Sequence, residues 1–284
     1  MKLIKSNASL GGQIQDIDLK VQLDVSQINF INQSWNERLV VVFKNQDLND
    51  KALINFSKNF GELDPPGPNP YGITFLPEFP EINVISNVKS NNGVPIGNLG
   101  DGEAVWHADM TYNNLPPKAG ILYALEVPHN QGNTHFANMA LAYEELPQIL
   151  KDKIKDKILI HDSAHNSAGM LRKGYTESND PSQTPGAKHP LVIRDPQTNK
   201  QLLFLGRRPH AYILGMEINQ SEDLLDDIWQ HATQEKFTWT QQWDAGDLLM
   251  WKNLNVLHKR DAFDPSTRRV MHRTQLKGDV KIAS

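Results

Sequence analysis

The sequence of 284 residues contains no cysteine. This absence excludes disulfide-stabilised scaffolds, thiolate zinc sites, iron–sulfur clusters and cysteine nucleophiles. Any bound metal ion must therefore be held by histidine, aspartate or glutamate side chains. The sequence also lacks an apolar run of the ~18–20 residues that a membrane-spanning helix needs, and its first residues lack the apolar stretch of a signal peptide. We therefore expect a cytoplasmic protein that does not act at a membrane.

A large excess of charge of either sign is also missing. The chain has 29 lysine and arginine residues against 33 aspartate and glutamate residues, a net charge of −4. This balance argues against nucleic acid as the main partner. Hydrophobic residues make up 39%, enough for a sizeable core. We expect a single domain over residues 1–284, and the sequence leaves open whether it forms a homo-oligomer.

Short apolar segments of strand length dominate the sequence, and helices lie between them. The strands are expected over residues 11–19, 39–43, 82–88, 119–126, 191–194, 202–205, 247–251 and 269–276. Amphipathic helices are expected over residues 50–60, 138–146 and 221–233. This pattern predicts a mainly β fold with peripheral helices, a β-sandwich or jelly roll rather than a parallel doubly wound sheet.

Three segments are expected to be loops. Residues 64–80 are rich in proline and glycine, residues 91–102 are rich in glycine, and residues 163–188 are polar. A polar loop as long as 163–188 inside a compact domain is often a lid or a binding loop, and plain disorder is the alternative interpretation.

His107 and Asp109 form the only His-x-Asp sequence in the chain. Residues i and i+2 of a strand point to the same side, so the two side chains can converge on one point. An imidazole and a carboxylate suit Fe(II) or Mn(II), although a chance surface pair is the better explanation of this motif when it is taken alone. A second histidine from the C-terminal block 246–273 would complete two histidines and one carboxylate, and would leave metal positions open for catalysis.

Two arginines of the C-terminal block are placed on one strand face. Arg269, Met271 and Arg273 share that face, whereas Val270 and His272 share the other. Guanidinium groups are costly to bury without anions and are well shaped to hold carboxylates by two hydrogen bonds. We therefore predict that this strand binds an acidic ligand; a solvated basic strand is the alternative.

A set of motifs then resembles one known family. They are Trp106–Tyr112, Pro116-Pro117, Leu122–Ala124, Glu126–Pro128, Gly132–Thr134, Ala142-Tyr143 and the segment from Trp251 to Asp279. In this order and spacing they are similar to the taurine dioxygenase and 2,4-dichlorophenoxyacetate dioxygenase family of Fe(II)- and 2-oxoglutarate-dependent oxygenases. The resemblance extends over nearly the whole chain, from Gly11 to Asp279.

The resemblance implies a double-stranded β-helix (jelly-roll) core and a set of site residues. It assigns His107, Asp109 and His258 to Fe(II). It assigns Arg269, together with Thr134, to the distal carboxylate of 2-oxoglutarate. The implied reaction consumes O2 and 2-oxoglutarate, releases succinate and CO2, and oxidises an unactivated C–H bond; ascorbate would support activity. Related halogenases have a small residue at the position of Asp109, so this chain is expected to hydroxylate.

The prime substrate is expected to be a small molecule, with an acid or amino-acid head group as one possibility. The resemblance places Arg273 near it, where the side chain could hold an anionic group. Further candidates for substrate contact are Tyr112, Asn87, Asn98 and Tyr71. Taurine enzymes have a histidine after their Phe-Gly-Glu/Asp-Leu stretch. Here residues 60–63 are followed by Asp64 and prolines, and a carboxylate facing the pocket would repel a sulfonate. Taurine is therefore disfavoured as the substrate.

Two rival functions use the same fold. A cupin-type isomerase or hydrolase would need the three metal ligands but neither Arg269 nor Thr134. A non-catalytic binding module would bind no iron, which the intact ligand set argues against. The remaining histidines that were considered show no ligand spacing: His135, His161, His165, His189, His210, His231 and His272.

Overall fold

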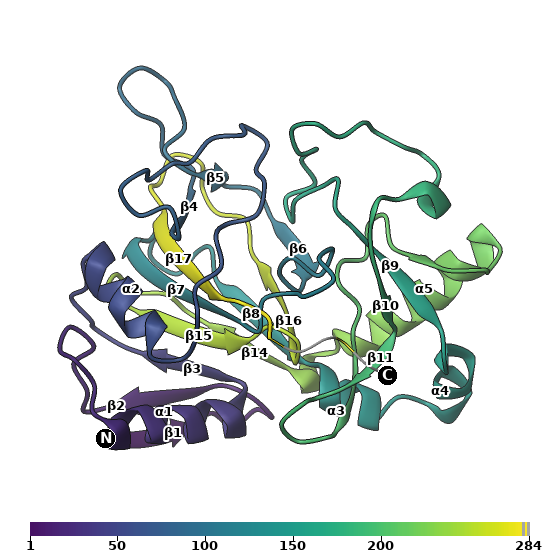
Figure 1. Cartoon of the computed structure of the whole chain (residues 1–284), viewed down its shortest axis with the longest axis horizontal. Helices are drawn as coiled ribbons and strands as arrows, with labels where there is room; N and C mark the ends of the chain where they lie inside the picture. Colours follow the sequence, from purple (N-terminus) through teal and green to yellow (C-terminus); the bar gives the residue numbers. More distant parts are fainter. Residues whose placement is uncertain (280–281, 283–284) are drawn as a thin grey trace.

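The computed structural model describes residues 1–279 and 282, and its largest element is an eight-stranded sheet (Figure 1). The strand order is β1-β2-β3-β15-β7-β17-β4-β5. These strands span Lys2–Lys5 (β1), Gly12–Gln15 (β2), Val40–Phe43 (β3), Leu248–Lys252 (β15), Ala119–Glu126 (β7), Val270–Leu276 (β17), Asn83–Ser86 (β4) and Asn98–Leu99 (β5). The pairs β2–β3 and β4–β5 are parallel, and the other neighbours are antiparallel.

A four-stranded antiparallel sheet packs on the larger one. Its order is β14-β8-β16-β6, with the strands Thr238–Gln241 (β14), Thr134–Asn138 (β8), Val256–Arg260 (β16) and Ala104–His107 (β6). One cluster of buried side chains joins the two sheets, and it includes Val40 and Val42 from β3 with Phe136 from β8 and Val256 from β16. The two facing sheets confirm the predicted β-rich, jelly-roll architecture.

Helices cover the outer faces of this core. Val41 and Phe43 point away from the second sheet and pack with residues of α1 (Val25–Arg38) and α2 (Asp50–Lys58). Because β3 is buried on both faces, its sequence is apolar at every position instead of alternating. The other helices lie at the opposite end of the view in Figure 1: α3 (Met139–Glu144), α4 (Gln148–Ile154) and α5 (Ile218–Ala232). No helix of the described residues has the length and apolar character to cross a membrane.

Two smaller sheets lie beside α5. They are β10 (Gly186–Pro190), β9 (Ile158–Asp162) and β13 (Tyr212–Ile213) in one sheet, and β11 (Val192–Arg194) with β12 (Gln201–Leu203) in another. Two short 3₁₀ helices span Pro181–Gln183 and Glu235–Phe237. The segment 163–188 therefore ends in a strand, and its first residues, Ser163 to Ser167, are buried.

The element predictions were right for the apolar strands and incomplete for the polar ones. The predicted helix over 138–146 is α3, and Asn138 caps it by accepting hydrogen bonds from the backbone N–H groups of Ala140 and Leu141. The helix α1 was missed because only Ile31, Ser34 and Trp35 of its fourteen residues are buried, which gives a weak apolar period. Strands β8 and β16 were not predicted either, and β6 ends at His107, so Asp109 lies beyond the strand that the His-x-Asp sequence was expected to occupy.

Candidate active site

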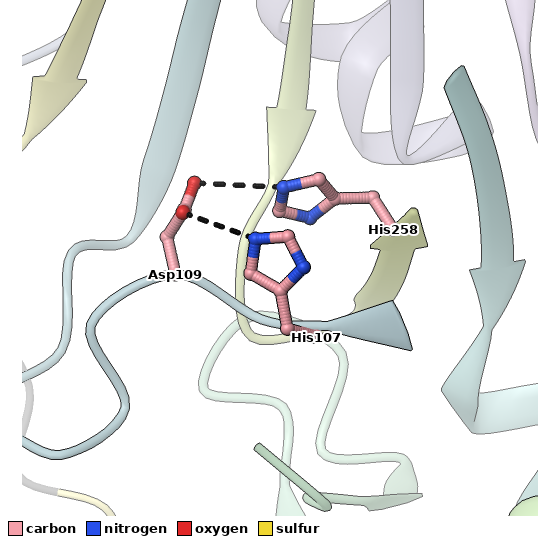
Figure 2. Close-up of side chains that lie close together, drawn as sticks. All are labelled: His107, Asp109 and His258. Carbon is pink, nitrogen blue, oxygen red and sulfur yellow. Dashed lines mark ion pairs between the residues drawn. The ribbon is translucent and has the colours of Figure 1, made fainter. Parts of the chain in front are cut away.

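Three side chains from two distant segments meet at the end of β6. His258 on β16 lies directly opposite His107 on β6 in the antiparallel register, and Asp109 follows two residues after His107. Figure 2 shows the three side chains turned toward one another. The distance from His107 Nε2 to Asp109 Oδ1 is 3.6 Å, and that from His258 Nε2 to Asp109 Oδ2 is 3.8 Å. One ligand atom of each residue lies within 4.8 Å of the others, which allows all three to bind one metal ion.

Both imidazole rings are prepared for metal binding. His107 Nδ1 lies 2.7 Å from the carbonyl oxygen of Val105, so Nδ1 carries the proton and Nε2 is free to act as a ligand. The ring of His258 packs against Phe136 and Trp251. Burial, together with the neighbouring His107, lowers the pKa of His258 well below its usual value. The ring is therefore neutral, as a metal ligand must be.

Asp109 is fixed from two sides. Burial alone would raise its pKa, but Arg273, His258 and His107 together hold the pKa of this carboxyl well below its usual value. Arg273 Nη1 donates to Asp109 Oδ1 over 2.8 Å. The backbone of Asp109 is held by Asn253, whose Oδ1 accepts from the Asp109 N–H and whose Nδ2 donates to the Asp109 carbonyl, each over 2.8 Å. The carboxylate is therefore charged and positioned before any metal binds.

Asn253 was not predicted to take part in the site, and its removal should weaken metal binding. The Asn253 side chain also donates to the carbonyl of Pro117 over 2.8 Å and is fully buried. Asn253→Ala leaves three backbone groups unpaired at about 1–3 kcal/mol each. Because groups that orient a ligand typically contribute 10–100-fold to metal affinity, Mn(II) titration should show a loss of roughly that size. Asn91→Ala in an exposed loop is the control; unchanged Mn(II) affinity in Asn253→Ala would mean that Asp109 holds its position unaided.

Arg269 lies in a cavity that reaches the two histidines. This cavity, called here the Arg269 cavity, is lined by Arg269, Thr134, Arg260, His107 and His258 among others. Arg269 is only 2% exposed, and its Nε has no hydrogen-bond partner among the described residues. Burial, with a smaller contribution from Arg260, lowers the pKa of Arg269 well below its usual value. A buried cation in this state needs an anion, and a carboxylate has the matching charge and shape.

Thr134 contributes a hydroxyl group to the same cavity. It lines the Arg269 cavity from β8, and its Oγ1 accepts a hydrogen bond from Trp243 Nε1 over 2.9 Å. This bond fixes the hydroxyl oxygen as an acceptor toward Trp243 and frees the hydroxyl proton for another partner. Arg269, Thr134 and the histidines therefore line one cavity, and the burial of Arg269 and Arg273 excludes the alternative of a solvated basic strand.

A second cavity borders the histidine–aspartate group and shares His107 and Arg273 with the Arg269 cavity. This Tyr112 cavity is lined by Tyr112, Asn98, Arg273, His107 and Asp109 together with residues 67–70 and parts of the segment 163–188. Three of the predicted substrate residues, Tyr112, Asn98 and Arg273, are thus brought together. Asn98 Nδ2 also donates to Asn83 Oδ1 over 3.0 Å.

The other two predicted substrate residues lie outside this cavity. Asn87 donates to the carbonyl of Thr267 over 2.7 Å and accepts from the N–H of Arg269 over 3.0 Å, so it fixes the start of β17. Tyr71 is 42% exposed and packs on Phe75.

Asp64 does not line the Tyr112 cavity either, so it cannot provide the expected repulsion of a sulfonate there. Residues 67–70, which do line it, contain no basic residue.

A second cluster of possible ligand side chains contains two histidines. His165, Glu177 and His210 offer ligand atoms within 4.8 Å of one another. His165 Nδ1 lies 2.9 Å from Asp162 Oδ2, and His165 Nε2 lies 3.1 Å from Glu177 Oε2. Since both ring nitrogens of His165 already have carboxylate partners, this cluster is better explained as a hydrogen-bonded network than as a metal site.

The chain matches a known family over almost its full length. The sequence model described as "Taurine catabolism dioxygenase TauD, TfdA family" matches residues 5–275. The alpha-ketoglutarate-dependent 2,4-dichlorophenoxyacetate dioxygenase of Cupriavidus pinatubonensis is 28% identical over 276 residues, which is 95% of each chain. The (S)-phenoxypropionate/alpha-ketoglutarate-dioxygenase of Delftia acidovorans is also 28% identical and covers 98% of this chain and 95% of its own.

Solved structures agree with this match. The crystal structure of AAD-2 in complex with Mn(II) and N-oxalylglycine superposes with a TM-score of 0.80 at 27% identity and covers 99% of both chains. The likeness thus extends to the fold of the whole chain.

Proposed function

Because the chain belongs to the TauD, TfdA family, we propose that it oxidises an unactivated C–H bond of a small acidic molecule. The chain is a 2-oxoglutarate-dependent non-haem iron dioxygenase, and it uses Fe(II) and 2-oxoglutarate. What is proposed is the kind of substrate, the hydroxylation outcome and the role of each residue.

His107, Asp109 and His258 would hold Fe(II). Two imidazole nitrogens and one charged carboxylate form the donor set that suits this ion and leaves open positions on one side. When bound there, Fe(II) with 2-oxoglutarate and O2 supplies the oxidising chemistry, and succinate and CO2 are released as the substrate is oxidised. Since Asp109 fills the third ligand position, hydroxylation is the expected outcome rather than halogenation.

Arg269 and Thr134 would bind the distal carboxylate of 2-oxoglutarate. The single observation that carries the proposal is the buried Arg269 guanidinium, which has no carboxylate partner among the described residues and lies in a cavity that shares both histidines with the metal site. The Arg269–Thr134 pair has no role in the alternative function, a cupin-type isomerase or hydrolase. The low exposure of the cavity residues would also keep water away from the reacting groups.

Arg273, Tyr112 and Asn98 would contact the prime substrate, since they line the Tyr112 cavity beside Asp109. An acidic substrate fits their basic and donor character, and the relatives named above act on phenoxyacetate and phenoxypropionate compounds. Neither Asn87 nor Tyr71 is included among the proposed substrate contacts.

The expectations of one domain over 1–284, of a lid at 163–188, of a cytoplasmic location and of ascorbate support stay predictions, and the oligomeric state stays open.

A substrate screen tests the proposal. The protein with Fe(II), ascorbate and 2-oxoglutarate would be offered aryloxyacids, amino acids, sulfonates and phosphonates, and succinate and O2 uptake would be measured. We expect succinate formation to rise at least several-fold with one of these acids, with aryloxyacids ahead of taurine. The absence of succinate with every compound would instead favour the isomerase or hydrolase.

A further inference from the structure

The Tyr112 cavity contains a third guanidinium that none of the roles above uses. Arg172 belongs to the segment 163–188, lines the cavity and is only 9% exposed. Its Nη1 donates to the carbonyl of Ser163 over 2.8 Å, and its guanidinium lies 4.2 Å from the centre of the Tyr112 ring. These contacts fix the side chain against one wall of the cavity and leave its Nε without a hydrogen-bond partner among the described residues.

The charges around the cavity leave Arg172 without a balancing carboxylate. The two acidic residues of the lining, Asp109 and Asp162, form ion pairs with Arg273 and Arg207 respectively. Arg172 has no ion pair among residues 1–279 and 282. The two positive charges of Fe(II) and the two negative charges of 2-oxoglutarate would cancel. Binding of both would therefore leave the charge of Arg172 without a balancing carboxylate. A buried, unpaired guanidinium is costly unless an anion joins it.

Two further donors without partners lie in the same lining. Asn166 is 7% exposed, and its Oδ1 accepts from the N–H groups of Ala168 and Met170 over 3.0 and 2.9 Å. These two bonds fix the amide orientation and leave Nδ2 as a donor with no partner in the described part of the chain. The buried Tyr112 hydroxyl is likewise unpaired, and because burial raises the pKa of Tyr112, the hydroxyl keeps its proton as a donor at neutral pH.

We propose that Arg172, Asn166 and Tyr112 bind the acid group of the prime substrate, a carboxylate or a sulfate. These three side chains offer one positive charge and hydrogen-bond donors to the cavity. Oxyanions are the ligands that accept several such hydrogen bonds at once. Arg273 is less suited to this task because its charge is already paired with that of Asp109. The proposal rests on the proposed function and deepens it, since it gives the segment 163–188 the role of selecting acidic over neutral substrates.

Binding without turnover tests the assignment. The protein would be loaded with Mn(II) and N-oxalylglycine in place of Fe(II) and 2-oxoglutarate, and ligand binding measured by calorimetry. The probes are 2,4-dichlorophenoxyacetate and hexyl sulfate, each compared with a neutral counterpart, 2,4-dichlorophenoxyacetamide and hexanol. We expect the unaltered protein to bind at least one acid and to bind the neutral counterpart roughly 10- to 100-fold more weakly, as expected for loss of a charged hydrogen-bonding partner.

Variants separate this role from a structural one. Arg172→Gln should weaken acid binding roughly 10- to 100-fold and abolish the preference for the acid, with N-oxalylglycine binding unchanged. Arg172→Lys should retain part of the preference, and Tyr112→Phe, which keeps the ring under Arg172, should weaken acid binding roughly 10-fold. The control is Lys173→Gln, which removes the same charge from the exposed neighbouring residue and should change nothing.

Three results would overturn the assignment: neither acid binds the unaltered protein, the neutral compounds bind as well as the acids, or Arg172→Gln and Tyr112→Phe bind acids normally. Failure of the unaltered protein to bind N-oxalylglycine at all would contradict the proposed function instead, so the two failures are distinguishable. A thermal unfolding measurement on each variant verifies that it is folded.

Discussion

Replacing Asp109 with asparagine should abolish metal-dependent turnover while the chain stays folded. An asparagine can still accept the hydrogen bond from Arg273, so the buried guanidinium keeps a partner. The neutral amide oxygen is, however, a much weaker ligand for a divalent ion than the carboxylate. Changes to groups that only orient a ligand cost 10–100-fold in metal affinity, so the loss of a ligand should exceed ~100-fold. Mn(II) titration and succinate formation measure the two effects separately.

His107→Ala should have the same consequence through a different ligand. The matched control is His129→Ala, because His129 is exposed and lies outside the site. Thermal unfolding should show each variant folded. Retention of iron-dependent turnover by either Asp109→Asn or His107→Ala would show that the ligand assignment is wrong.

Arg269→Met should weaken the binding of 2-oxoglutarate without lowering the stability of the ligand-free protein. The guanidinium is buried with no carboxylate partner among the described residues, and its strongest contact is a 3.5 Å hydrogen bond to the Gly132 carbonyl. Replacing such a charge with an apolar side chain of similar size is often neutral or stabilising by about 1–4 kcal/mol. We therefore expect the ligand-free variant to unfold at the same or a higher temperature. Its requirement for 2-oxoglutarate should rise on the order of 10²–10³-fold, the usual effect of deleting a buried charged partner.

Arg268→Ala provides the control for this change. Arg268 is the adjacent residue of the same type, but it is exposed and pairs with Glu126 at the surface. Its loss should leave the 2-oxoglutarate requirement unchanged, since surface ion pairs contribute little. If Arg269→Met binds 2-oxoglutarate as tightly as the unaltered chain, the distal carboxylate must be held elsewhere in the Arg269 cavity, and the role given to Arg269 is wrong.

The unpaired buried cations have a common physical explanation. Arg269 and Arg172 each lie in a cavity next to the metal-binding group, and each lacks a carboxylate partner in the described part of the chain. A folded chain tolerates such a charge only at a cost in stability. We infer that this cost is offset when an anionic ligand binds, which makes ligand binding and folding stability rise together. Ligand-free protein should therefore unfold at a lower temperature than protein with Mn(II) and N-oxalylglycine.

The sequence by itself determined the elements whose pattern is set by burial alone. The run at β3 is apolar at every position because both faces are covered, and α3 has an asparagine at its start because a helix leaves N–H groups unpaired there. The motif from Trp106 to Tyr112 and the block around His258 also carried the family resemblance, and with it the metal and 2-oxoglutarate assignments.

Only the tertiary structure decided what surrounds those residues. Strands β8 and β16 were missed because they carry Thr134 and His258 at positions where an ordinary strand would be apolar, so the site itself weakens their pattern. Asn166 and Arg172 belong to no motif, and the motif that contains Asn253 does not indicate its hydrogen bonds to Asp109, since these roles come from contacts with residues elsewhere in the fold. Asn87 and Tyr71 lie outside the Tyr112 cavity for a related reason: a sequence lists side chains that can bind, but the folded backbone decides which of them line the cavity.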